Sequence, residues 1–196
     1  MPAPHPVSFL QLNAFLVATA LFVIAVAWIA LRNIDRSTAR TRRLTSTFGL
    51  ALQSFACAAA GIGVVSPTLP WWAFFSIVST ILVVLLGGAA VALFLSAAST
   101  MGKNWSLVAR TRADHELVRT GPFAMIRHPI YLAVLLYLIS IAAALGHWPQ
   151  LMLAIPLYLT GTFIRIRDEE ALLRAQFGED HARYVREVPA LIPLIA

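Results

Sequence analysis

Five long apolar runs, separated by polar segments, constrain this chain more than any other feature of its sequence. They cover residues 12–31, 44–65, 71–98, 130–145 and 148–164. A helix needs roughly 20 apolar residues to cross a bilayer, a length that the first two runs match and the third exceeds, whereas the last two are at or below the usual range. With 59% hydrophobic and only 12% charged residues, the chain exceeds what a soluble core needs. The sequence therefore predicts an all-α integral membrane protein with about five transmembrane helices.

The charged residues are distributed so that a five-span chain carries all of them on one side. All 15 lysines and arginines and all nine acids fall in residues 32–43, 103–127 and 165–187. The positive-inside rule makes that side cytoplasmic and places the N-terminus outside. The first run has its arginines after it, so we expect it to be retained as a span and not cleaved as a signal. These patterns predict a protein of the inner cell membrane with its active site on the cytoplasmic side.

The net charge of +6 and the residue types that are absent limit the functions open to the chain. Basic residues that flank spans attract anionic lipid, and no interleaving of aromatic and basic residues suggests a nucleic-acid groove, so membrane lipid and not nucleic acid is the expected partner. Cys57 lies within an apolar run, where packing is its expected role. The five histidines show no ligand spacing, and a serine elbow, a glycine-rich phosphate loop and a cysteine pair are absent. No metal site is predicted.

Two regions of different character make up one integrated domain. Residues 1–98 hold three runs with hardly any polar side chain and are predicted to form a membrane scaffold, whereas residues 99–196 hold two runs and nearly all of the polar chemistry. After the last run, apolar residues recur every three or four positions as far as Val188, interrupted by Gly178. This spacing predicts a C-terminal cytoplasmic amphipathic helix that breaks at Gly178 and ends before Pro189. It would either cover a site or only anchor the C-terminus at the interface.

Residues 121–131, with the sequence GPFAMIRHPIY, place an arginine and a histidine against the start of an apolar helix. Pro129 suits the first helical position because its missing N–H costs nothing there, so we expect the helix to begin at Pro129. Free N–H groups and the positive end of the helix dipole would then lie beside Arg127 and His128, which favours anion binding. The alternative is that both side chains only reach the interface and contact lipid phosphate.

A second polar cluster, formed by Arg165, Glu169 and Glu170, follows the fifth apolar run. Arg165 and Glu169 are four residues apart on one helical face, so an ordinary surface ion pair is one interpretation. Charges at the edge of an apolar run cost free energy unless they have partners, however, and such charges often mark functional sites. A short connection at residues 146–147 would make the fourth and fifth spans antiparallel neighbours. We therefore expect this cluster to face His128.

Together the two clusters predict an anion pocket, a pair of carboxylates and a lipid-facing wall. Such a site suits a reaction between a ligand that bears both cationic and anionic groups and a partly apolar substrate. Methyl transfer fits, because an in-line displacement needs positioning and charge stabilisation more than a strong acid or base.

The order of several short motifs resembles that of a known family. The segments GKNWS at 102–106, HELVRTGPF at 115–123 and RHPIY at 127–131 are followed by Arg165, Glu169-Glu170, Phe177-Gly178, Tyr184 and Val188-Pro189. This order is similar to that of the isoprenylcysteine carboxyl methyltransferases. Over residues 99–195 the chain resembles a compact, prokaryotic-type member of that family.

The resemblance implies an S-adenosylmethionine-dependent methyltransferase whose cofactor pocket is built by the last two spans and the cytoplasmic segments. The residues that would line the adenosyl part are His115, Leu117, Val118 and Gly121. Those that would hold the methionyl part are Arg127, His128 and Tyr131. Glu170, with or without Glu169, would bind ribose or ammonium groups, and Arg165 would be the catalytic residue that orients the acceptor carboxylate.

The resemblance further implies carboxyl O-methylation of an isoprenylcysteine-like or other lipophilic acid, so a prenylated or lipophilic molecule is the expected substrate. A carboxylate is already ionised at neutral pH, so the reaction requires no general base. Two other interpretations stay open. One is a membrane reductase of the sterol type that uses NADPH and carries a similar Arg-His-Pro segment, and the other is a non-enzymatic lipid-binding membrane protein whose charge clusters bind only phosphate headgroups.

Overall fold

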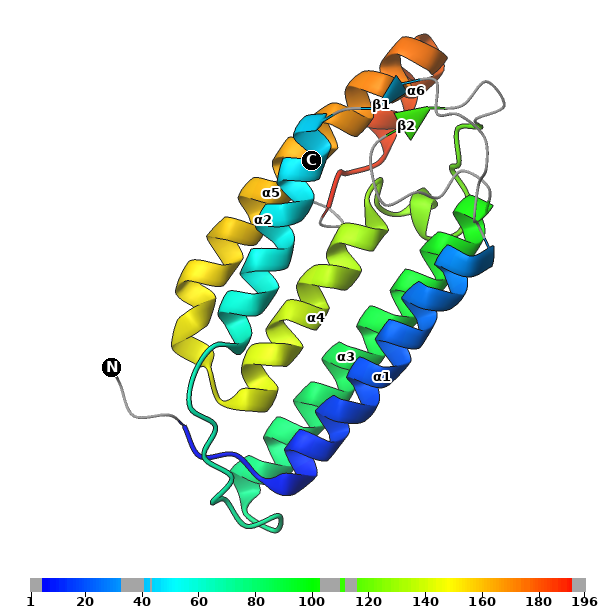
Figure 1. The fold of residues 1–196 in the computed structure, drawn as a ribbon. Coiled ribbons are helices and arrows are strands. Elements are labelled where there is room, and N and C mark those ends of the chain that lie inside the picture. Colours follow the sequence, from blue (N-terminus) through cyan, green and yellow to red (C-terminus); the bar gives the residue numbers. More distant parts are fainter. Residues whose placement is uncertain (1–4, 33–40, 43, 103–109, 112–115, 192–196) are drawn as a thin grey trace.

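The computed structural model describes residues 5–32, 41–42, 44–102, 110–111 and 116–191, and these residues form a bundle of helices (Figure 1). The long helices are α1 (Phe9–Arg32), α2 (Leu44–Gly61), α3 (Phe74–Met101), α4 (Pro129–Leu145) and α5 (Leu151–Phe177), and the shorter α6 (Glu179–Glu187) follows α5. Two 3₁₀ turns, η2 (Gly121–Ala124) and η3 (Trp148–Gln150), precede α4 and α5. Strands β1 (Thr41–Arg42) and β2 (Arg110–Thr111) pair antiparallel, with Thr41 opposite Thr111. The helical fold class is as predicted.

Glycine and proline set the ends of the helices that carry the polar clusters. Pro129 is the first residue of α4, as predicted. Gly146 ends α4 with a φ of 71°, a left-handed conformation in which glycine is favoured because it has no Cβ. Gly178, with a φ of 50°, separates α5 from α6. Gly146 therefore ends α4 at the connection to α5, and Gly178 interrupts the chain between α5 and α6.

Two helices of the described residues, α1 and α3, are long and apolar enough to cross a membrane. Only 17% and 22% of their most apolar stretches are buried inside the bundle, so most of their side chains face outward, unlike those of a soluble core helix. Leu16, Val23 and Leu85 are among the large apolar side chains that are exposed in this way. α4 is a shorter apolar helix of 17 residues. The count of five spans and the division at residue 98 remain predictions.

Close packing of small residues organises the bundle. α1 lies along α3, α3 along α4, and α2 along α5 (Figure 1). A Cβ on Gly87 of α3 would lie 2.7 Å from the Cβ of Ala18, so the absence of a side chain there lets α1 and α3 approach closely. A second group of buried side chains, including Ala56, Leu138 and Tyr158, joins α2, α4 and α5.

The arrangement of α4 and α5 differs in part from the expectation. They are antiparallel and joined by a short connection, but the most extensive partner of α5 is α2 and not α4. The reason is a glycine on each of the two helices, Gly49 and Gly161, which lets their backbones come together. α4 and α5 nevertheless meet at a hydrogen bond of 2.7 Å from the Tyr158 hydroxyl to the Tyr131 carbonyl oxygen.

One end of the bundle gathers the helix ends that adjoin the basic segments. The last residues of α1 and α3, the first residues of α2 and α4, and the junction of α5 with α6 all lie at the upper end in Figure 1. The short connection at Gly146 lies at the other end. This arrangement brings the two polar clusters to the same level of the molecule, whereas its orientation in a membrane remains a prediction.

Candidate functional site

The start of α4 is closed by the C-terminal segment. The backbone N–H groups of Arg127 and His128 donate to the carbonyl oxygens of Pro189 and Ala190 at 2.9 and 3.0 Å. The N–H of Tyr131 donates to the His128 carbonyl oxygen at 3.1 Å. The expectation that N–H groups at this helix end are free for an anion is therefore wrong for these three residues, and charged side chains dominate the site instead.

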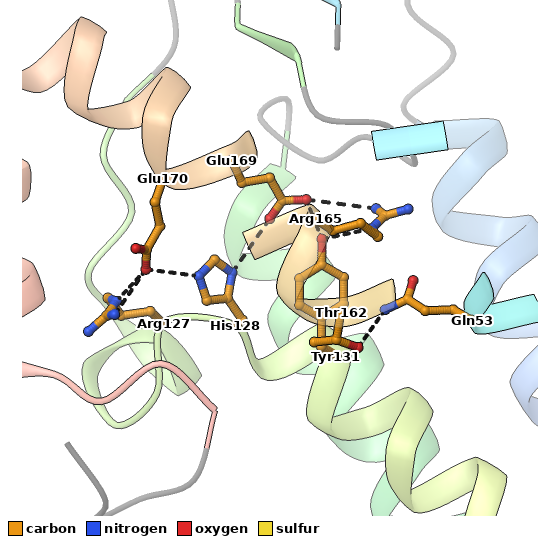
Figure 2. A network of polar contacts seen from close by, with 8 residues as sticks. All are labelled: Gln53, Arg127, His128, Tyr131, Thr162, Arg165, Glu169 and Glu170. Carbon is orange, nitrogen blue, oxygen red and sulfur yellow. Dashed lines mark hydrogen bonds and ion pairs between the residues drawn. The ribbon is translucent and has the colours of Figure 1, made fainter. Parts of the chain in front are cut away.

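His128 and the carboxylates of α5 face each other, as the sequence predicts (Figure 2). The His128 ring lies between two acids, with Nδ1 3.5 Å from Oε2 of Glu169 and Nε2 3.3 Å from Oε1 of Glu170. The Arg127 guanidinium reaches the same Glu170 oxygen, with Nε and Nη2 each at 2.9 Å. The two residues that precede α4 therefore bind to adjacent residues of α5.

Tyr131 extends this network to Arg165. The Tyr131 hydroxyl donates a hydrogen bond to Oε1 of Glu169 and accepts one of 2.9 Å from Nε of Arg165. Nη2 of Arg165 lies 3.7 Å from the same Glu169 oxygen, which is the ion pair expected from their spacing. The Arg165 side chain is only 6% exposed, so this pair is not an ordinary surface ion pair. A buried arginine is held here by a tyrosine and a carboxylate at the end of apolar helices.

The electrostatics of the cluster favour the charged forms of its members. Burial raises the pKa of a carboxylate, but the His128 hydrogen bond and the charge of Arg127 outweigh it and hold the pKa of Glu170 at about 2. The pKa of Glu169 is also lowered, because His128 and Arg165 outweigh its burial. Burial lowers the pKa of His128, but its hydrogen bonds with the two glutamates prevail and raise it. Two carboxylates are thus paired with three basic side chains.

α6 and the segment after it fix the other side of Arg127. Nη1 of Arg127 donates to the Val185 carbonyl oxygen at 3.1 Å and also to that of Val188. The Tyr184 hydroxyl donates to the Phe123 carbonyl oxygen at 2.6 Å, which ties α6 to the turn before α4. Because Arg127 contacts both Glu170 and the backbone after α6, the position of α6 is coupled to the polar cluster.

The other described residues that were predicted for the cofactor are outside this network. Leu117 and Val118 are half-buried in the segment before η2. Gly121 begins η2 with a φ of 59°, and a Cβ on it would lie 3.0 Å from Oγ1 of Thr100. His115 lies outside the described residues. The structure therefore brings together Arg127, His128, Tyr131, Arg165, Glu169 and Glu170, and does not join Leu117, Val118 or Gly121 to them.

Sequence reasoning missed two contributions to this region. Gln53 of α2 donates a hydrogen bond of 2.8 Å to the Thr162 hydroxyl of α5, and both side chains are buried. The only sequence signal was a lone glutamine within an apolar run. His181 of α6 is buried, and burial lowers its pKa, so it is neutral. Its spacing of three from the buried Tyr184 was the only signal for its inward position.

A cavity of about 400 Å³ opens beside the network along α5. It is lined by Arg167, Glu170, Ala171, Arg174 and Ala175. Glu170 therefore contacts both His128 and Arg127 and also lines this cavity. The arrangement can bind a ligand that carries both positive and negative groups.

Comparisons with known proteins find similarity over the half of the chain that holds the polar network. Residues 80–175 match the model of the isoprenylcysteine carboxyl methyltransferase (ICMT) family. A protein-S-isoprenylcysteine O-methyltransferase of Schizosaccharomyces pombe is 34% identical over 103 residues, which are 51% of this chain and 43% of that protein. The cobalt-zinc-cadmium resistance protein CzcN of Cupriavidus metallidurans is 32% identical over 102 residues, 50% of this chain and 45% of that protein.

A third relative has a similar share of identical residues. The nickel-cobalt-cadmium resistance protein NccN of Alcaligenes xylosoxydans xylosoxydans is 32% identical over 102 residues, which are 50% of this chain and 46% of that protein. The chain thus aligns with less than half the length of each of these three relatives. The matched family region contains Arg127, His128, Tyr131, Arg165, Glu169 and Glu170.

Proposed function

We propose that this chain, which belongs through residues 80–175 to the isoprenylcysteine carboxyl methyltransferase family, uses S-adenosylmethionine to methylate the carboxylate of a lipophilic acid. The exposed apolar surfaces of α1 and α3 support a place for the chain in a membrane. One observation carries the proposal: Arg165, buried at the end of apolar helices, shares a single polar network with His128 and two carboxylates.

The side chains of this network fit the cofactor by their chemistry. The methionyl part of S-adenosylmethionine bears a carboxylate and an ammonium group, which suit basic and acidic partners respectively. Arg127 and His128 supply the basic groups, and Glu169 and Glu170 supply carboxylates that are ionised at neutral pH. The cavity beside Glu170 is within the range of about 300–1,000 Å³ typical of small-molecule sites. Bound there, the cofactor supplies an electrophilic methyl group.

Arg165 is the residue suited to the acceptor. A guanidinium presents a planar fork that grips a carboxylate with two parallel hydrogen bonds. The Tyr131 hydroxyl and Glu169 hold the head of this side chain in place, so less conformational freedom is lost when an acceptor binds. An ionised carboxylate is itself the nucleophile, and no side chain has to remove a proton from it.

The acceptor is proposed to be lipophilic because the site adjoins the apolar part of the bundle. Its tail would stay in hydrocarbon while its carboxylate meets Arg165, which spares about 0.8 kcal/mol for each CH₂ kept from water. The one-sided distribution of basic residues supports a cytoplasmic location for this end of the bundle, and the inner cell membrane is part of the proposal. An isoprenylcysteine is one such acid.

Calorimetry on the detergent-purified chain tests the proposal. S-adenosylhomocysteine should bind with one site per chain, and NADPH should not bind. Binding of NADPH alone would favour a reductase of the sterol type. Binding of neither ligand, together with retention of anionic phospholipid, would replace the enzyme with a lipid-binding protein.

A further inference from the structure

α2 meets α5 through two glycines that face each other. A Cβ on Gly49 would lie 2.7 Å from the Gly161 carbonyl oxygen and 2.7 Å from Cγ of Arg165. A Cβ on Gly161 would lie 2.7 Å from the Gly49 carbonyl oxygen, with Cβ of Leu52 at 3.0 Å. Small residues let helices in a membrane approach this closely. A side chain at position 49 would therefore press on both the α5 backbone and the stem of Arg165.

The Arg165 side chain is held at both ends. Its stem lies against the backbone of Gly49, while its guanidinium bonds the Tyr131 hydroxyl and pairs with Glu169. The guanidinium carbon also lies 5.2 Å from the centre of the Tyr131 ring. An arginine has several rotatable bonds, so fixing its stem limits where its fork can point. The surface of α2 at Gly49 thus helps to determine the direction of the guanidinium.

Two further contacts hold α2 in register with α5 on either side of Gly49. The Gln53 side chain donates to Thr162 at 2.8 Å, and the Thr45 hydroxyl donates to the Asp168 carboxylate. These contacts bracket Gly49 along α2 and Arg165 along α5. They prevent α2 from sliding, so the same part of its backbone remains opposite Arg165.

We propose that Gly49 is a positioning residue for Arg165, so that α2, although distant in sequence from the polar clusters, helps to align the guanidinium with the acceptor carboxylate. This inference rests on the proposed function, because Arg165 is the group assigned to the acceptor. Gly49 itself touches neither substrate nor cofactor. Its effect is exerted through the stem of Arg165.

Three glycine-to-alanine variants separate positioning from packing. Gly49→Ala presses on both Arg165 and the α5 backbone, Gly161→Ala presses on Gly49, Leu52 and Gln53 of α2, and Gly88→Ala meets nothing within 4 Å. We expect Gly49→Ala to lower kcat/KM for the acceptor by about 10²-fold, the effect of misplacing a catalytic group by about 1 Å. S-adenosylhomocysteine affinity should stay unchanged. Gly161→Ala should lose much less turnover, and Gly88→Ala none.

Acceptor turnover in the glycine variants decides whether Gly49 positions Arg165. Equal losses of acceptor turnover in Gly49→Ala and Gly161→Ala, or wild-type turnover in Gly49→Ala, would overturn the positioning role. Absence of S-adenosylhomocysteine binding in the wild type would instead overturn the proposed function, independently of the glycine variants.

Melting temperatures measured in detergent test the contact between position 49 and Arg165 without an activity assay. This test also works when Gly49→Ala folds poorly. Replacing Arg165 by alanine removes the Cγ atom, so Gly49→Ala should lower the melting temperature less in an Arg165→Ala chain than in the wild type. The effect of Gly161→Ala should be the same in both chains. If the Gly49→Ala effect is also the same in both, the contact does not restrain Arg165.

Discussion

Glu170→Gln removes one negative charge from the centre of the polar network while keeping the shape of the side chain. In the structure one Glu170 oxygen accepts a hydrogen bond of 2.9 Å from Nε of Arg127, forms an ion pair of 2.9 Å with its Nη2, and lies 3.3 Å from His128. Glu170 also lines the cavity proposed for the cofactor. The substitution should therefore weaken both the network and the binding of a cationic ligand.

The expected magnitude follows from the strength of a buried charge-assisted hydrogen bond. Its loss costs roughly 1–3 kcal/mol, which is about 5- to 150-fold in the Kd of S-adenosylhomocysteine. The lowering of the Glu170 pKa from 4.5 to about 2 means that the ionised carboxylate also contributes to the stability of the folded state at neutral pH. Because this pKa is depressed, the contribution is present above pH 4.5 and is lost as the pH falls towards 2.

Calorimetry at pH 7 in detergent measures the Kd, and thermal unfolding under the same conditions shows that the variant is folded. Glu179→Gln, which makes the same change at an exposed position in the first turn of α6, is the matched control. It should bind as the wild type does. A folded Glu170→Gln chain with wild-type affinity would remove Glu170 from the binding site and refute the reasoning.

Three further predictions concern catalysis, pH and topology. Arg165→Lys should keep cofactor affinity but lose most kcat/KM for the acceptor, because an ammonium cannot form the two-pronged grip; loss of cofactor binding instead would move Arg165 to the cofactor pocket. The raised pKa of His128 stabilises the fold fully below its ordinary value of 6.5, and this stabilisation is lost as the pH rises through the raised pKa. The melting temperature should fall across that range in the wild type but not in His128→Asn, and parallel curves would contradict the assignment. Cysteines at Ala3 and Ala196, in a chain lacking Cys57, should label from outside and inside the cell respectively, and equal labelling from outside would rule out the five-span topology.

Local signals explain why the polar clusters were predictable. The apolar runs locate the long helices, and Pro129 and Gly178 mark the ends of two of them whatever the rest of the chain does. The short connection between α4 and α5 makes the two helices antiparallel. The start of α4 and the end of α5 therefore lie at the same end of the bundle. The contacts of His128 with Glu169 and Glu170 follow from these few constraints.

The contacts that were not predictable depend on pairings between distant segments. Nothing in the sequence near Arg127 indicates that its N–H meets the carbonyl oxygen of Pro189, since backbone hydrogen bonds carry no side-chain signature. The choice of α2 as the main partner of α5 depends on Gly49 and Gly161 lying opposite each other. A single sequence contains many small residues and does not show which of them are opposed. Gln53, a polar residue within an apolar run, was a hint that α2 faces another helix.

Methyl transfer to a series of acids tests the central claim most directly. Thioether-linked acids with tails from short alkyl to farnesyl would be incubated with the purified chain and radiolabelled S-adenosylmethionine in a fixed detergent. The account predicts that label appears in the acid as a methyl ester, that apparent acceptor affinity rises with tail length, and that Arg165→Lys abolishes most of the transfer. Absence of transfer to every acid, with S-adenosylhomocysteine bound, would contradict carboxyl methylation, and a preference for short water-soluble acids would contradict a lipophilic acceptor.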